Sequence, residues 1–210
     1  MKIRKFRHAS VEAPAPRTLL VLVPAALLAS LATGDLIAHF DDDDYYAPRY
    51  LERMAGWIGD AGLVRLAGWF IYSQPQSRLW YWDQRVVTEP THFRLLREIL
   101  DAKPVSRLSE EDQKHWIDGN LKGWGFCFVY RRDIATEVGF ESVEHGEDGK
   151  FLRGLCELGH EVVQAVDEEG LVIKLKHPND TSNLFPQYAL PDFLLDHLFE
   201  PGIREFFELP

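Results

Sequence analysis

The segment RLWYWDQRVV, residues 78–87, restricts the possible folds of this chain more than any other segment. Successive side chains of a β-strand point to opposite faces. One face of such a strand would carry Leu79, Tyr81, Asp83, Arg85 and Val87, and the other would carry Trp80, Trp82, Gln84 and Val86. Because both faces are bulky, we expect this strand to be covered on both sides, by its own fold or by a partner.

The neighbouring segments predict the remaining elements. Residues 63–73 resemble a second strand, and the sequence QPQS at 74–77 predicts a turn between the two strands. Apolar residues at helical spacing predict a helix over 47–62, and a cap at Ser109 predicts another that ends at Gly119 or Gly123. Residues 24–40 also favour a helix, with a break near Gly34. Residues 160–177 predict a hairpin with Gly170 in its turn, and residues 190–210 predict two short helices.

These patterns indicate a mixed α/β (α+β) fold. We expect a central mixed sheet with flanking helices and an acidic C-terminal lobe made of a hairpin and helices. The polar segment ESVEHGEDGK suggests a joint, which would divide the chain into a main domain, 1–143, and a C-terminal lobe, 144–210. A single domain is the alternative at this length of 210 residues.

Charge is distributed unevenly along the chain. Residues 133–210 contain five Lys/Arg against seventeen Asp/Glu, a net charge of −12. This excess opposes binding to nucleic acid, because affinity for a phosphate backbone depends on cationic side chains. It favours a basic protein partner, although acidity that serves only solubility explains the same composition.

The N-terminal segment allows two interpretations. Residues 1–17 are basic and residues 18–33 carry no charge, which is typical of an export signal cleaved near Ala32. A buried strand over 18–23, followed by a helix that Pro24 opens, accounts for the same residues. The apolar run is too short for a stable membrane span, and we expect a cytoplasmic protein.

The sequence offers weak candidates for catalysis. His160 and Glu161 begin a segment like a zinc-protease helix, but Gln164 stands where the second histidine ligand is required. The run HFDDDDYY could hold Mg²⁺ or Ca²⁺ through Asp41–Asp44, yet no matching ligands follow, so a solvated acidic loop is favoured. We therefore expect no catalytic residue, metal or cofactor; a metal-dependent hydrolase using residues 39–44, His160 and Glu161 is an alternative.

Binding to another protein explains more of the residues, since Trp, Tyr and Arg concentrate at the energetic centres of interfaces. Core packing remains an alternative for the tryptophans. The candidate partner-binding residues are Trp80, Tyr81, Trp82, Asp83, Arg85, Glu144, Asp148, Phe193, Leu194, Leu198 and Phe206.

Three short motifs resemble one known family. Tyr81, Trp82, Asp83, Arg85 and Val86 lie in an aromatic strand, Leu108, Glu111, Gln113 and Trp116 follow in a predicted helix, and APRYLERM occupies residues 47–54. Together they resemble the adaptor chaperones that load effectors onto the spike of bacterial type VI secretion systems. The resemblance implies a cytoplasmic, non-catalytic protein that holds a toxic effector.

The alternative within the same class is an acidic immunity protein that inhibits a cognate toxin. The acidic residues that motivate it are Glu144, Glu147, Asp148, Asp167, Glu168 and Glu169. Neither version specifies an oligomeric state.

Overall fold

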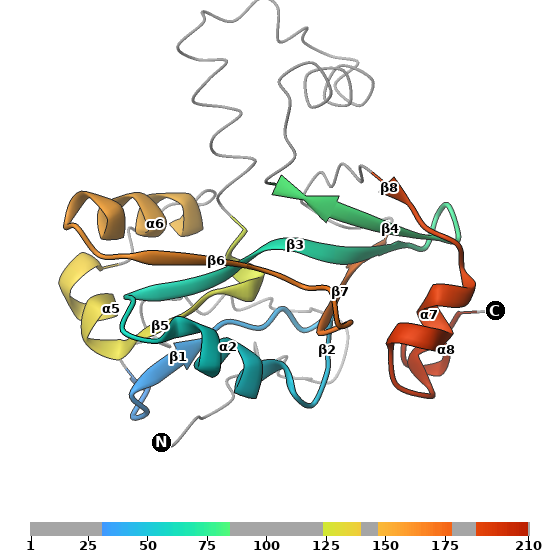
Figure 1. Ribbon diagram of the computed structural model, residues 1–210, viewed down its shortest axis with the longest axis horizontal. Helices are drawn as coiled ribbons and strands as arrows, with labels where there is room; N and C mark the ends of the chain where they lie inside the picture. The colour runs from blue at the N-terminus through green and yellow to red at the C-terminus, as the bar shows by residue number, and fades with distance from the viewer. Residues whose placement is uncertain (1–30, 85–123, 140–146, 178–187, 210) are drawn as a thin grey trace, which may run out of the picture. The chain divides into compact units, whose positions relative to one another are not determined.

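A computed structural model describes residues 31–84, 124–139, 147–177 and 188–209. The described residues form two compact units, and the element labels are those of Figure 1. The first unit takes its residues from 1–42, 54–65 and 123–163, and the second unit takes its residues from 43–53, 66–122 and 164–210. The boundary predicted between residues 143 and 144 and the helix predicted to begin at Ser109 lie outside the described residues.

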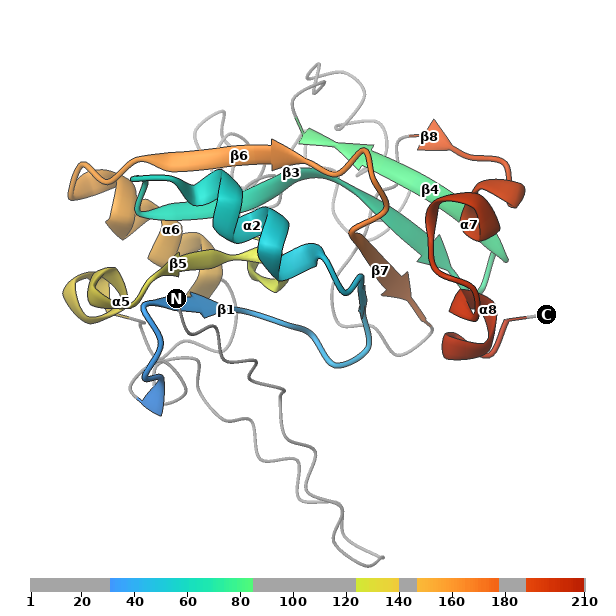
Figure 2. The same cartoon turned by 60° about the horizontal axis from the view of Figure 1, so that its bottom comes forward.

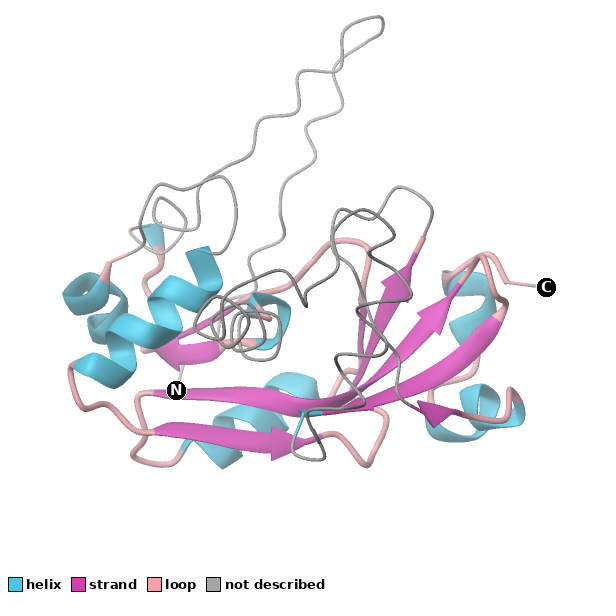
Figure 3. Ribbon diagram, turned by 90° about the horizontal axis from the view of Figure 1, so that it is seen from above, coloured by secondary structure: helices cyan, strands magenta, loops and turns pink. Residues whose placement is uncertain are grey.

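The second unit is organised around strand β3 (Leu63–Ser73), whose later residues belong to it. The turn at 74–77 connects β3 to the antiparallel strand β4 (Arg78–Asp83), with Phe70 opposite Tyr81. Strand β7 (Val172–Lys176) pairs in parallel with β3, and it places Ile173 beside Phe70. The short strands β2 (Tyr45–Tyr46) and β8 (Tyr188–Ala189) pair antiparallel with β7 and β4, respectively. Figure 3 draws the strands in magenta. Parallel and antiparallel pairs therefore coexist, which confirms the predicted mixed sheet.

The hairpin predicted over 160–177 does not form. Strand β6 (Val162–Val166) and strand β7 both pair with β3 and not with each other. The carboxylate of Asp167 accepts hydrogen bonds from the backbone N–H groups of Leu171 and Val172, at 2.7 and 2.9 Å. These bonds fix the conformation of the loop between β6 and β7, so that β7 pairs with β3. A hairpin turn would instead have paired β7 with β6.

The two C-terminal helices form as predicted. Helix α7 (Phe193–Leu198) and helix α8 (Ile203–Phe206) are the red segments of Figure 1. Their apolar side chains pack against the sheet of the second unit. The buried cluster comprises Phe70, Tyr72, Leu79, Ile173, Leu175, Leu195, Phe199, Ile203 and Phe207. It supplies the hydrophobic burial that drives folding of this unit.

The first unit has its own core. Strand β1 (Leu36–Ala38) pairs antiparallel with β5 (Val129–Arg131), and β5 also pairs with the start of β3 (Figure 2). A 3₁₀ turn, η3 (Gly125–Cys127), precedes β5, and helices α5 (Arg132–Val138) and α6 (Glu147–Glu157) complete the unit. Strand β1 corrects the predicted helix for residues 36–38, after the break expected near Gly34, because these residues pair with a strand about ninety positions later in the sequence.

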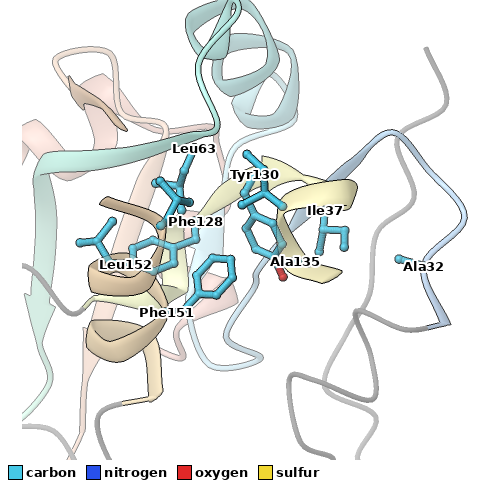
Figure 4. Close-up of a cluster of buried hydrophobic side chains, with 10 residues drawn as sticks. Ala32, Ile37, Leu63, Phe128, Tyr130, Ala135, Phe151 and Leu152 are labelled. Carbon is cyan, nitrogen blue, oxygen red and sulfur yellow. The ribbon is translucent and has the colours of Figure 1, made fainter. Parts of the chain in front are cut away.

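Aromatic side chains fill the centre of the first unit. The rings of Tyr130 and Phe151 lie 4.9 Å apart, with Phe128 and Leu63 beside them (Figure 4). Helix α2 (Tyr50–Ile58) follows the predicted helical spacing, since Tyr50, Met54 and Ile58 are all buried. None of the helices within the described ranges is long and apolar enough to cross a membrane.

Candidate functional site

An acidic turn precedes strand β2. Among the described residues, Asp41, Asp43 and Asp44 form a group in which one carboxylate oxygen of each residue lies within 4.8 Å of the other two. They belong to one continuous run of four aspartates, so chain connectivity alone keeps them close. Carboxylates this close repel one another unless cations compensate their charge.

Lys174 provides part of that compensation. Its ammonium donates to Oδ2 of Asp44 at 3.0 Å, and the N–H of Leu175 donates to Oδ1 at 2.9 Å. Both charged side chains are almost entirely buried, with 7% of Lys174 and none of Asp44 exposed. A buried ion pair offsets its desolvation cost only when its geometry and its additional hydrogen bonds are good, and here the backbone of β7 supplies such a bond.

His177 lies beside Asp43. Its Nε2 is 3.1 Å from Oδ2 of Asp43, and both side chains are partly exposed. Asp41 is partly exposed as well, so two of the three carboxylates are accessible to solvent, while Asp44 is buried and paired with Lys174. The sequence predicted a solvated loop here, and Asp44 departs from that prediction because β7 covers it.

The acidic turn fits a hard divalent cation. Mg²⁺ is held in proteins by oxygen ligands, usually one or two carboxylates with water and substrate phosphates completing its shell. Asp41 and Asp43 would be the ligands, and Asp44 would keep its hydrogen bonds to Lys174 and Leu175. The donor set therefore suits a hard cation that keeps part of its water shell.

A pocket of about 300 Å³ lies elsewhere in the second unit. Its lining residues are Phe70, Tyr81, Asp83, Val166, Asp167, Glu168, Leu190 and Leu194. The structure thus brings together three of the residues that the sequence nominated, Tyr81, Asp83 and Leu194. It adds Asp167 and Glu168, which the sequence had noted for their charge alone.

Asp167 forms one wall of the pocket and is fully buried. Besides Leu171 and Val172, the N–H of Glu169 donates to this carboxylate at 3.0 Å. Burial raises the pKa of Asp167 above its ordinary value, because removing the ionised form from water outweighs the backbone hydrogen bonds that favour it. Both oxygens of the Asp167 carboxylate accept hydrogen bonds from its own loop, so this residue forms part of the pocket wall.

Tyr81 connects β4 to the same loop. Its hydroxyl donates to the backbone carbonyl of Asp167 at 3.0 Å, and its ring meets Phe70 edge-on at 4.9 Å between centroids. Gly68 makes room for this arrangement, since a Cβ there would lie 2.7 Å from the Tyr81 hydroxyl oxygen. The aromatic wall of the pocket therefore depends on a glycine in the facing strand.

The two tryptophans of β4 occupy the opposite face, as strand alternation predicts. Trp82 is buried and stacks on Trp69, with ring centroids 6.0 Å apart. Trp80 is half-buried, and the guanidinium of Arg78 lies 6.0 Å from its ring centroid. Packing within the chain thus accounts for Trp82, while Trp80 remains partly accessible.

The other nominated residues fall at separate places. Leu194 and Leu198 pack against the core of the second unit, whereas Phe193 and Phe206 are 66% and 57% exposed. Asp148, at the start of α6, accepts a hydrogen bond from the N–H of Gly125 at 3.1 Å and so has a structural role in the first unit. Arg85 and Glu144 lie outside the described residues. Binding to a partner through any of these residues stays a prediction.

The proposed convergence of His160 and Glu161 with residues 39–44 is not found among the described residues. The ring of His160 meets Glu137 at 3.0 Å, and the carbonyl of Glu161 accepts the N–H of Gly62. His39 meets the hydroxyl of Tyr130 at 2.9 Å. None of the three belongs to the acidic group of Asp41, Asp43 and Asp44.

Sequence reasoning weighed the four aspartates as a cation site but lacked the residues that complete the arrangement. Lys174 and Leu175 lie about 130 positions away and reach Asp44 only through the pairing of β2 with β7. The signal that was visible is the run of four aspartates between apolar segments. Glu168 gave no signal apart from its charge.

A search of curated proteins finds no match to this chain. The family described as "Glycosyl transferase family 2" matches residues 26–139, which is more than half of the chain. This match contradicts the resemblance to type VI secretion adaptor chaperones. The aromatic motif behind that resemblance reflects packing, since Trp82 stacks on Trp69 within the sheet. The chain belongs to glycosyl transferase family 2.

Proposed function

We propose that this protein is an enzyme that transfers a sugar unit from an activated donor to an acceptor. The observation that carries the proposal is the family match over residues 26–139, which includes the acidic turn at Asp41–Asp44. Transfer of a sugar requires a leaving group on the anomeric carbon, and a phosphate ester is a suitable one. Carboxylates that can hold a divalent cation support a phosphate-bearing donor.

The residues of the turn have distinct roles in this proposal. Asp41 and Asp43 would hold the cation, and a cation held there would supply positive charge that stabilises a departing phosphate. Asp44 orients the turn, because Lys174 and the N–H of Leu175 fix both of its oxygens.

The family match replaces the earlier functional predictions. The effector chaperone or adaptor was inferred from the resemblance of three short motifs, and the immunity protein from the acidic C-terminal residues. The family match contradicts both, and neither feature is incompatible with an enzyme. The prediction of no catalytic activity is therefore wrong, and the metal-dependent hydrolase gains no better support. A protein partner and cytoplasmic location stay predictions; neither follows from the proposed activity.

The test is a transfer assay with purified protein, a panel of nucleoside-diphosphate sugars as donors, a panel of simple sugars as acceptors, and Mg²⁺ or Mn²⁺. Release of nucleoside diphosphate is measured for the wild type, for Asp43→Asn and for the matched control Asp60→Asn, an exposed aspartate outside the turn. We expect release that stops on chelation and falls at least about tenfold in Asp43→Asn, with the control unchanged.

Binding of Mn²⁺ to the same three proteins, measured by electron paramagnetic resonance, separates metal binding from turnover. Loss of Mn²⁺ binding in Asp43→Asn alone supports the assignment of the turn. Equal Mn²⁺ binding by all three proteins would contradict it. Absence of release with every donor would contradict the proposed transfer.

A further inference from the structure

The pocket of the second unit has an unusual distribution of charge. Its described lining includes three carboxylates and no Lys, Arg or His. The remaining five lining residues are Phe70, Tyr81, Val166, Leu190 and Leu194. A ligand pocket is usually apolar with a few polar groups that orient the ligand, and here every charged group has the same sign.

The three carboxylates differ in what they can offer to a ligand. Asp167 is fully buried and accepts backbone N–H groups through both oxygens. Asp83 is nearly buried at the end of β4, with 7% exposure. Glu168 is exposed and makes no hydrogen bond or ion pair to any residue that the structure describes. Glu168 is therefore the group available to meet a new charge.

The adjacent Glu169 differs from Glu168, because Glu169 has cationic partners. Glu169 is held by Arg53, whose guanidinium donates through Nε and Nη2 to Oε2 at 3.1 and 2.8 Å. Arg49 also reaches the carbonyl of Glu169. The cations near this loop are thus engaged on Glu169, and the negative charge of Glu168 is left for a ligand.

The apolar walls define the size and character of the ligand. A volume of about 300 Å³ is at the small end for ligand pockets, and suits one sugar ring. The edge-to-face pair of Phe70 and Tyr81 presents aromatic carbon, against which C–H groups of a ring pack and a cation is attracted.

We propose that this pocket binds an amine-bearing sugar, whose ammonium group is recognised by Glu168 and whose ring packs against Tyr81. That this sugar is the acceptor rests on the function proposed above. Charge complementarity selects the class of ligand, because a phosphate or carboxylate on the sugar would face the like charge of Glu168. A neutral sugar would make the apolar contacts but lose the ionic one.

Isothermal titration calorimetry of the full chain with glucosamine, glucose and glucose 6-phosphate tests the pocket directly. No donor or metal is added, so the result is independent of transfer. We expect glucosamine to bind about fivefold or more tightly than glucose, with an affinity that weakens at high salt. Glucose 6-phosphate should bind more weakly than either.

Glu168→Gln is the decisive variant, because an exposed side chain can be changed without affecting folding. It should remove the preference for glucosamine over glucose and leave glucose binding unchanged. The matched control is Glu157→Gln, an exposed glutamate on α6 in the first unit. Equal binding of glucosamine and glucose by the wild type, or a preference that persists in Glu168→Gln, would overturn the proposal.

The outcome can be separated from that of the proposed function. Binding of glucosamine without any transfer activity would leave the pocket assigned and refute the enzyme. Transfer that occurs with neutral acceptors alone, without glucosamine binding, would refute the pocket and leave the enzyme in place.

Discussion

Two buried aspartates in the second unit solve the same physical problem in different ways. Asp44 in the acidic turn is paired with the ammonium of Lys174 and one backbone N–H. Asp167 in the β6–β7 connection is held by three backbone N–H groups and no cation that an observed contact identifies. The first arrangement balances charge and links β2 to β7, whereas the second leaves a net negative charge and stabilises its own loop.

This difference predicts which substitutions lower the free energy of unfolding most in each region. Removing one charge of a buried pair leaves the other uncompensated, which is more costly than losing hydrogen bonds to a neutral backbone. The stability of the acidic turn should therefore depend on the charge of Lys174. The stability of the β6–β7 connection should depend on the two accepting oxygens of Asp167. The following predictions test this contrast.

The largest effect is expected for Lys174→Met, which retains the side-chain length but removes the ammonium. The carboxylate of Asp44 would remain buried without its cation, and we expect a loss of about 3–5 kcal/mol in the free energy of unfolding. Urea denaturation followed by tryptophan fluorescence measures it. A loss below about 1 kcal/mol would mean that Leu175 and water satisfy Asp44 without the lysine.

A smaller effect is expected for Asp167→Asn. The amide replaces one accepting oxygen with an NH₂ group that faces backbone N–H donors, so at least one bond to Glu169, Leu171 or Val172 is lost. We expect a loss of about 1–3 kcal/mol in the free energy of unfolding. The exposed Asp192→Asn is the control and should change little.

The pH dependence of stability should carry a signature of Asp167. Because its pKa is raised in the folded state, folding favours the protonated form, and its contribution to stability declines as pH rises above the ordinary value of 3.8. The amide of the Asp167→Asn variant does not titrate, so the stability gap between this variant and the wild type should narrow from about pH 4 to pH 7. A gap that widens over this range would show that the carboxylate is instead stabilised in its ionised form.

The smallest effect is expected for Arg53→Gln, which breaks the ion pair between Arg53 and Glu169. Both side chains are partly exposed, at 48% and 34%, so solvent screens the interaction. We expect a loss of about 0.2–1 kcal/mol that disappears at high salt. An effect that persists at high salt would indicate a structural role of the guanidinium in addition to its charge.

Local patterns in the sequence predicted local structure well. The alternation around Trp80 and Tyr81, the turn at 74–77 and the two short C-terminal helices each depend on residues close in the chain. Helix α6 was not foreseen, because the polar residues of its first turn resemble a linker.

The candidate site was less predictable, because its contacts are long-range. The fixing of Asp44 requires the pairing of β2 with β7, and the pocket requires the β6–β7 connection to meet β4 through Tyr81 and Asp167. A hairpin was the natural local prediction for residues 160–177. No spacing in the sequence reveals that both of its strands instead pair with β3.

The attachment of β6 and β7 to one strand has a consequence for how the sequence can change. The connection through Gly170 is fixed at both ends, so an insertion or deletion of one residue would shift β7 by one position against β3. Side chains alternate along a strand, and every residue of β7 would then exchange faces. Lys174 would turn away from Asp44 and an apolar neighbour would take its place. The length of the short loop between β6 and β7 thus determines whether Lys174 can pair with Asp44 in the acidic turn.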